Sequence, residues 1–215
     1  MLEAIIWDLD GVIVDSGPYH LQAWQQLARE NGQEFSEEQF RRTFGMRSPE
    51  IIATVFGEGL PEEQVASLAK RKEELFRNAV RGHVSSLPGA VELIHSTDRA
   101  GFRLALASSA PYENVELILD SLQLKNHFDV IVTSEDVTAG KPDPQIFLIA
   151  AKRLGARPAN CLVIEDAVPG VQAAKAAGMK CIAVAGGSPR PGLEECDLVV
   201  DSLEMVDLAT ITSLA

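Results

Sequence analysis

The sequence is poor in cysteine and in positive charge, and it has no long apolar run. Its three cysteines are an odd number at spacings that match no zinc or redox pair, which excludes a disulfide scaffold in a chain of 215 residues. Cys161 and Cys181 lie inside short apolar segments, so we expect both to be buried structural thiols. The four histidines are scattered without metal-ligand spacing. The sequence therefore predicts no transition-metal site.

Basic residues number 19 against 31 acidic ones, which gives a formal net charge of -12. This balance argues against a surface that binds nucleic acid or anionic membranes. Any anionic substrate therefore needs locally placed positive charge. The first apolar run, "AIIW", is four residues long and is followed at once by acids, so it predicts neither a signal peptide nor a membrane span. We expect a cytoplasmic, monomeric protein that acts on a small molecule.

Short apolar runs bounded by turn residues recur along the chain. Their continuous apolar character, without alternation, is typical of parallel strands that are covered on both faces. The predicted strands are "AIIW" (4–7), "FRLALA" (102–107), "DVIVT" (129–133), "CLVIE" (161–165) and "KCIAVA" (180–185). After Pro88 these runs alternate with helical segments at 89–100, 111–124, 144–155 and 169–178. This alternation predicts an α/β fold with an open parallel sheet.

Residues 17–81 break the alternation, because they carry only helical periodicity. The predicted helices in this block are 18–31, 36–44, 49–56 and 60–80. Consecutive helices between the first strand and the rest of the sheet indicate an inserted helical subdomain. We assign residues 1–16 and 82–215 to the α/β core and residues 17–81 to the insert, with two connections that can act as a hinge.

Polar residues follow the predicted strands, where an open α/β sheet has its binding crevice. They are Asp8 and Asp10 after the first strand, Ser108 and Ser109 after the second, Lys141 after the third, and Glu165 and Asp166 at the fourth. Each alone has an ordinary explanation, such as a turn, a helix cap or a contact with a helix dipole. Together they predict one crevice lined by carboxylates, a hydroxyl group and a lysine.

Clustered carboxylates repel one another and need a counter-charge. A hard divalent cation supplies it, and an oxygen-only ligand set points to Mg²⁺. A calcium-binding EF-hand loop fits poorly, because Val12 and Ile13 stand where that loop needs an acid and a glycine. Asp10-Gly11 between apolar runs is also a strong hairpin signal, but a hairpin leaves Asp8 unexplained. The segment "VDSG" (14–17) resembles an aspartic-protease loop, although those all-β enzymes use two such loops.

Four motifs resemble the haloacid dehalogenase superfamily, specifically its β-phosphoglucomutase-like branch with a helical cap. They are "DLDGV" (8–12), "LALASS" (104–109), "GKPDP" (140–144) and "VIEDAVPGV" (163–171), in the order and spacing of that family. The resemblance covers nearly the whole chain. It implies a Rossmann-like core, Mg²⁺ dependence and phosphoryl transfer through an aspartyl-phosphate.

The resemblance also implies a role for each motif residue. Asp8 would be the nucleophile and Asp10 the general acid and base, while Ser108 and Lys141 would hold the phosphoryl oxygens. Asp8, the Asp10 carbonyl group and Asp166 would hold Mg²⁺, with Glu165 beside them.

The predicted helix at 61–80 carries an apolar stripe that is interrupted by Lys72. Either Lys72 extends outward to solvent or it points from the cap towards an anionic substrate. His20 and Trp24 lie one helical turn apart, and they either pack together inside the cap or face the cleft. In the family that the chain resembles, the matching histidine and lysine act near the substrate, which favours a sugar phosphate.

Departures from the mutase pattern favour a hydrolase. Arg47 in "GMRSPE" is displaced by two positions, and Ala110 and Pro111 stand where polar contacts are expected, so a clamp for a second phosphate is weakened. We therefore expect a hydrolase of a small phosphate monoester, with a β-phosphoglucomutase and a non-catalytic ligand-binding relative as alternatives. The intact set of motif residues argues against the non-catalytic alternative. The candidate substrate contacts are His20, Trp24, Arg47, Lys72 and Ser109.

Overall fold

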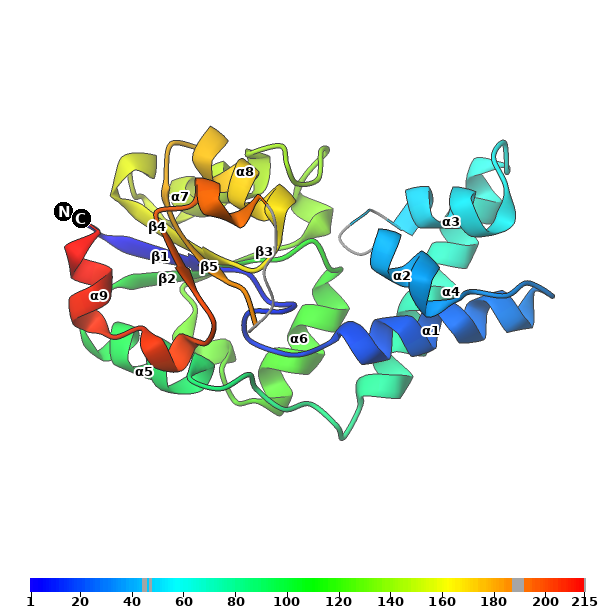
Figure 1. Ribbon diagram of the computed structural model, residues 1–215, viewed down its shortest axis with the longest axis horizontal. Helices are drawn as coiled ribbons and strands as arrows, with labels where there is room; N and C mark the ends of the chain where they lie inside the picture. Colours follow the sequence, from blue (N-terminus) through cyan, green and yellow to red (C-terminus); the bar gives the residue numbers. More distant parts are fainter. Residues whose placement is uncertain (44–45, 47, 187–191, 215) are drawn as a thin grey trace. The chain divides into compact units, whose positions relative to one another are not determined.

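The structure, a computed structural model of the chain, describes residues 1–43, 46, 48–186 and 192–214 (Figure 1). It divides the chain into two compact units, Met1–Asp15 together with Ser85–Ala215, and Ser16–Val84. Among the described residues, no helix combines the length and the apolar character needed to cross a bilayer.

The first unit is built on a parallel sheet, as the sequence predicted. In the described part of the chain its strands are β1 (Ala4–Trp7), β2 (Arg103–Ala107), β3 (Val130–Val132), β4 (Cys161–Glu165), β5 (Lys180–Val184) and β6 (Leu198–Val200). Their order in the sheet is β3-β2-β1-β4-β5-β6. The sixth strand was not predicted, because it is only three residues long and follows an acidic segment. Its position at the sheet edge leaves Val199 exposed.

Helices cover both faces of this sheet, which is why its central strands are apolar throughout (Figure 1). The α-helices of the unit are α5 (Ala90–Arg99), α6 (Tyr112–Ser121), α7 (Gln145–Leu154), α8 (Val168–Ala176) and α9 (Leu208–Ser213). Short 3₁₀ turns are η1 (Lys125–His127), η2 (Ser134–Asp136), η3 (Pro158–Asn160), η4 (Leu193–Glu195) and η5 (Leu203–Met205). Helix α7 packs on β1, β2 and β3, and α8 packs on β4 and β5. The α/β fold class is therefore confirmed.

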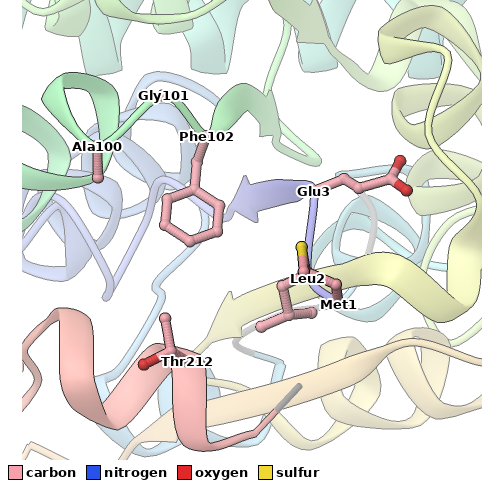
Figure 2. A pocket seen from close by; sticks show the side chains of 7 residues that line it. All are labelled: Met1, Leu2, Glu3, Ala100, Gly101, Phe102 and Thr212. Carbon is pink, nitrogen blue, oxygen red and sulfur yellow. The ribbon is translucent and has the colours of Figure 1, made fainter.

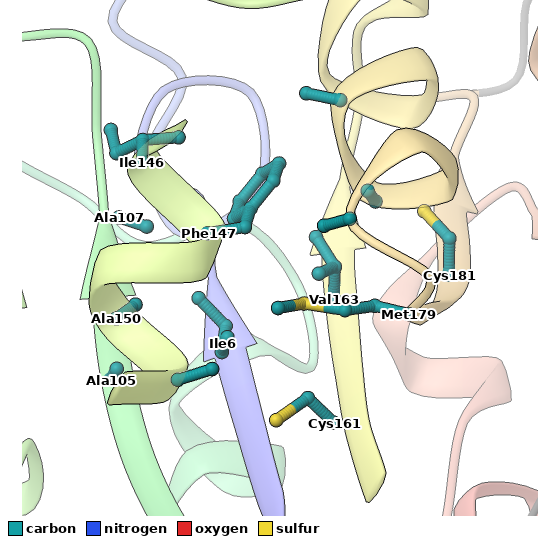
Figure 3. Close-up of a cluster of buried hydrophobic side chains, with 14 of the residues drawn as sticks. Ile6, Ala105, Ala107, Ile146, Phe147, Ala150, Cys161, Val163, Met179 and Cys181 are labelled. Carbon is teal, nitrogen blue, oxygen red and sulfur yellow. The ribbon is translucent and has the colours of Figure 1, made fainter. Parts of the chain in front are cut away.

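The core beneath α7 and α8 is made of small and branched apolar side chains. Figure 3 shows Ile6 and Val163 from neighbouring strands facing Phe147 of α7. Full burial of each such large side chain contributes about 1.5–3 kcal/mol. Cys161 and Cys181 lie in the same cluster, fully buried, and all three cysteines are free thiols. Burial raises the pKa of the Cys161 thiol to about 11, so these are packing residues, as predicted.

The second unit is helical. Its described helices are α1 (Gly17–Glu30), α2 (Glu37–Thr43), α3 (Ser48–Phe56) and α4 (Glu62–Val80), and α4 packs on α1 and α3. Helix α1 starts with Pro18 in its first turn and buries Trp24 and Leu27 on one face. An ion pair between Arg71 and Glu30 at 2.8 Å joins α4 to α1 at the surface of the unit.

Candidate active site

The predicted polar residues meet at one edge of the sheet. Strand β1 lies between β2 and β4, where the strand order reverses, and this is the point at which open α/β sheets bind ligands. The Asp8 backbone N–H donates to the Ile164 carbonyl at 2.9 Å, and the Ser108 N–H donates to the Val132 carbonyl at 3.0 Å. The parallel ladders therefore continue to the strand ends and fix the backbone of Asp8 and Ser108.

Three buried carboxylates are grouped at this edge. Asp8, Glu165 and Asp166 each place a carboxylate oxygen so that all three atoms lie within 4.8 Å of one another. Their exposed fractions are 6%, 1% and 3% respectively. Gly11 makes the approach of Asp166 possible, because an added Cβ would lie 2.2 Å from Asp166 Oδ2. Gly11 also has a φ of +82°, which disfavours any residue with a side chain.

Lys141 bridges two of these carboxylates. Its Nζ donates to Asp8 Oδ1 and to Glu165 Oε1, both at 2.6 Å, and lies 3.4 Å from the Ala107 carbonyl oxygen. Burial lowers the pKa of the lysine, but the two carboxylates outweigh burial and leave it above its usual value. Lys141 is therefore a permanent cation that reaches the end of β1 from the loop before α7.

For Asp8, the effect of burial on the pKa outweighs the effect of the neighbouring cation. Burial raises the pKa of its carboxyl group well above the usual range, and Lys141 lowers it. The negative charges of Glu165, Asp10 and Asp166 raise it further. Among the described residues, the carboxylates that act on Asp8 outnumber the ammonium group of Lys141, so this edge is rich in negative charge.

This excess charge and the donor set fit a hard divalent cation. The grouped ligand atoms are carboxylate oxygens, with no sulfur or imidazole nitrogen among them, and Mg²⁺ prefers such ligands. Asp8 and Asp166, with Glu165 beside them, are the side chains that would hold it.

Glu165 is fixed by contacts that the sequence did not reveal. Its Oε2 accepts the Asp166 and Ala167 backbone N–H groups at 2.8 and 2.9 Å. An added Cβ on Gly170 would lie 1.8 Å from Glu165 Oε1, so α8 must carry a glycine where it passes this carboxylate. Gly170 was not predicted as part of the site. The available signal was its position five residues after Glu165.

The segment after Asp8 forms a turn as well as part of the site. The Gly11 N–H donates to the Val14 carbonyl at 2.8 Å, and Asp10 and Val14 form an isolated β-bridge. Asp10 is half-buried, and its charge acts on Asp8. The turn signal at Asp10-Gly11 is thus confirmed together with the proximity of Asp10 to Asp8. In the loop that follows β2, Ser108 is buried and its hydroxyl oxygen accepts a hydrogen bond from the Ala110 N–H at 3.1 Å. Ser109, the next residue, is exposed.

The helical unit contains a second polar cluster. Lys72 is only 4% exposed, so the interpretation that it extends outward is wrong. Its Nζ lies 2.8 Å from His20 Nδ1 and 3.0 Å from Glu73 Oε1, and 5.5 Å from the centre of the Trp24 ring. The outward conformation fails because these internal partners satisfy the ammonium group inside the helix pair.

His20 and Trp24 are packed within the helical unit. The His20 ring stacks on Phe76 with centroids 3.9 Å apart, and Trp24 packs against Phe35 at 6.0 Å. Glu73 and Phe76 were not predicted as part of this cluster. Their place on α4 next to Lys72 was the available signal. Arg47 lies outside the described residues.

A hollow of about 580 Å³ lies at the opposite end of β1 (Figure 2). Its lining is mostly apolar and includes Leu2, Phe102 and Thr212. Its one acidic side chain, Glu3, is paired with Arg103 at 2.8 Å. The grouped carboxylates of Asp8, Glu165 and Asp166 define what we call the carboxylate edge of the sheet. The hollow lacks such a group of reactive side chains.

Comparison with known proteins identifies the family. Residues 2–178 match the family described as haloacid dehalogenase-like hydrolase. The chain is 35% identical over 213 residues to the chloroplastic 5-amino-6-(5-phospho-D-ribitylamino)uracil phosphatase of Arabidopsis thaliana, covering 98% of this chain and 57% of that protein. It is also 35% identical over 208 residues to β-phosphoglucomutase of Bacillus subtilis, covering 93% and 89% of the two chains.

A solved structure resembles the whole chain. The β-phosphoglucomutase of Clostridium difficile superimposes with a TM-score of 0.88 at 29% identity, over 100% of this chain and 97% of that one. The fold and the extent of the family match, residues 2–178, lead to the same family. The chain belongs to the haloacid dehalogenase-like hydrolases.

Proposed function

We propose that the protein is a Mg²⁺-dependent phosphohydrolase that removes phosphate from a small phosphate monoester through an aspartyl-phosphate on Asp8. The family supports a phosphatase acting on phosphorylated sugars or related compounds. The observation that carries the proposal is the buried Asp8 carboxylate, which lies 2.6 Å from Lys141 Nζ and is grouped with Glu165 and Asp166.

The proposed reaction consists of two successive displacements, in which the chain supplies the nucleophile and the proton donor and acceptor. An Asp8 oxygen attacks phosphorus and the ester P–O bond breaks, while Asp10 gives its proton to the leaving oxygen. Water then attacks phosphorus and the bond to Asp8 breaks, while Asp10 takes the proton of the water. Ser108 and Lys141 hold the phosphoryl oxygens. Mg²⁺, when bound, supplies further neutralisation of charge on those oxygens.

The substrate proposed is a small sugar phosphate. Two relatives are named for phosphate esters, one of a ribityl chain and one of glucose. Residues 17–81 would act as the cap and residues 1–16 and 82–215 as the core, with His20, Trp24 and Lys72 as substrate contacts in the cap and Ser109 in the core. The absence of polar side chains at Ala110 and Pro111 supports hydrolysis over a mutase that must retain a second phosphate. The monomeric state stays a prediction.

The test is a panel of sugar and sugar-alcohol phosphates incubated with wild type and Asp8→Asn in the presence of Mg²⁺. Released phosphate and isomerised sugar phosphate are both measured, with and without a bisphosphate activator. We expect free phosphate from several esters with wild type, and a loss of about 10³-fold or more with Asp8→Asn, because the nucleophile is gone.

Two results would contradict the proposal. Appreciable Mg²⁺-dependent turnover by Asp8→Asn would exclude the aspartyl-phosphate. Efficient conversion of β-glucose 1-phosphate to glucose 6-phosphate, with little free phosphate, would identify a mutase instead. Asp15→Asn is the matched control, because Asp15 is an exposed aspartate of the same segment.

A further inference from the structure

His95 and His127 lie together on the core unit, at a distance from the carboxylate edge. His95 belongs to α5, which leads into the start of β2, and His127 belongs to η1, which leads into the start of β3. Their ring centroids are 4.5 Å apart and the ring planes are tilted by 48°. Because Asp8 and Glu165 lie at the opposite ends of the strands, this histidine pair takes no part in the proposed chemistry.

Asp98 fixes the proton position on one of the two rings. His127 Nδ1 lies 2.6 Å from Asp98 Oδ2, and an ionised carboxylate can only accept a hydrogen bond. The Nδ1 atom therefore carries the proton, and in the neutral ring Nε2 has the free lone pair. A carboxylate behind a histidine is the usual support of a histidine that binds a metal ion.

The spacing of the two rings suits a shared cation. A cation that takes one nitrogen from each ring at about 2.1 Å, with a ligand angle between about 90° and 109°, holds the ring centres roughly 4.5–5.2 Å apart. The observed 4.5 Å lies in this range. In the described part of the chain, neither ring nitrogen of His95 has a hydrogen-bond partner, and His127 is 29% exposed, so solvent ions can reach the pair.

We propose that His95 and His127, supported by Asp98, form a second metal site that binds a divalent transition cation such as Zn²⁺ or Cu²⁺. Imidazole nitrogens favour these ions over Mg²⁺, so the two sites of the protein differ in selectivity. Water completes the coordination. The net charge of -12 favours the approach of a cation.

The alternative is a purely structural role, in which the Asp98–His127 hydrogen bond ties η1 to α5. Both roles use the same contacts, so stability measurements alone do not separate them. A measurement of which ring nitrogens bind a metal ion distinguishes the two roles.

The test is a Zn²⁺ titration of the untagged 215-residue chain in excess Mg²⁺, which is added to occupy the carboxylate edge. Calorimetry gives the affinity, and long-range ¹H–¹⁵N spectra of the imidazole rings show which nitrogens bind. We expect one equivalent of Zn²⁺ to shift His127 Nε2 and one nitrogen of His95, and to leave His20 and His83 unchanged.

Three variants and one control sharpen the result. His95→Asn and His127→Asn are each expected to abolish this binding event. Asp98→Asn should weaken it by about 10–100-fold, because loss of a supporting carboxylate typically has that effect. His83→Asn, which alters an exposed histidine elsewhere, should bind like wild type. Each variant is first checked by circular dichroism and should retain wild-type phosphatase activity.

The proposal is overturned if no imidazole nitrogen shifts, if only one of the two rings responds, or if His95→Asn and His127→Asn bind Zn²⁺ as wild type does. Failure of the phosphatase assay would leave this conclusion untouched, because the two sites share no residue.

Discussion

Asp8 shows how one residue acquires its chemistry from its neighbours. Aspartate is an ordinary residue in a turn, but here the strand before it is buried and three further carboxylates surround it. Lys141 is the counter-charge that the structure supplies, at 2.6 Å. The buried carboxylate is thus held in one orientation by a fixed cation, which is what its proposed role as the nucleophile of an in-line displacement requires.

Gly170 is the residue whose replacement most directly tests the support of this arrangement. We expect Gly170→Ala to lower kcat by about 10–100-fold, because an added methyl group would lie 1.8 Å from Glu165 Oε1 and would displace that carboxylate from Lys141. Alanine is a better helix former than glycine by about 1 kcal/mol, so helix propensity alone predicts that Gly170→Ala stabilises the protein. Steady-state kinetics and thermal melting measure the two effects.

Gln172→Ala, on the exposed face of the same helix, is the control and should behave as wild type. Wild-type kinetics for Gly170→Ala would show that the Glu165 position is not required for turnover.

Among the helices, α4 combines a packing face with an internal charge. The helix buries Leu68, Leu75 and Phe76 against its neighbours, and Lys72 lies among them. The lysine is tolerated because His20 and Glu73 accept its hydrogen bonds and aromatic rings lie about it. The sequence pattern located the stripe and the lysine within it, but it could not supply these partners.

Lys72→Met tests whether this lysine does more than hold α4 and α1 together. If it contacts the substrate phosphate or hydroxyl groups, KM should rise by about 10-fold or more with a small change in kcat, because one charged hydrogen bond to substrate is worth about 1.5–3 kcal/mol. Lys70→Met, on the exposed side of the same helix, is the control. Equal KM values for the two variants, measured on folded protein, would assign Lys72 a structural role only.

The whole core unit accommodates its grouped carboxylates at a cost in stability. Residues far apart in the sequence meet because the strand order places β1 between β2 and β4. In the described part of the chain, the same order brings the carboxylates of Asp10, Glu165 and Asp166 close to Asp8 and its counter-charge Lys141. Stability of the metal-free protein and readiness to bind a cation are therefore opposed in this fold.

This opposition predicts that Asp8→Asn stabilises the protein in EDTA at pH 7. The folded-state pKa of Asp8 lies above the ordinary value of 3.8, so ionised Asp8 destabilises the folded state once the pH exceeds that value. The advantage of asparagine should disappear as the pH falls below about 3.8, where wild-type Asp8 is protonated in both states. Urea unfolding at several pH values measures the free energy of unfolding.

Addition of Mg²⁺ should make wild type more stable than Asp8→Asn. A cation at 100 times its dissociation constant stabilises wild type by about 2.7 kcal/mol, whereas a variant that has lost one ligand gains less. EDTA should likewise abolish turnover reversibly. Equal responses of the two proteins to Mg²⁺ would show that Asp8 is not a ligand.

Much of the site could be predicted because strand ends in an open sheet are marked by sequence. A buried parallel strand is a short apolar run, so the polar residues after Trp7, Ala107 and Ile164 stand out, and they do lie at one edge. The edge strand β6 escaped prediction because it has only three residues, of which Val200 alone is buried, and this is too short for a recognisable pattern. Lys141 could be identified as a candidate, but the carboxylates that it contacts could not be predicted, because its loop has no periodicity.

The sequence by itself determined the α/β core, the helical insert and the motif residues, because burial and periodicity are local properties of the chain. Only the tertiary structure decided what depends on contacts between distant segments. It set Lys141 between Asp8 and Glu165, buried Lys72 beside His20, and required Gly170 where α8 passes Glu165. It also paired His95 with His127, although their separation in the sequence predicted no metal site. Spacing along the chain reports neighbours within one element, whereas the geometry of a site is set by packing between elements.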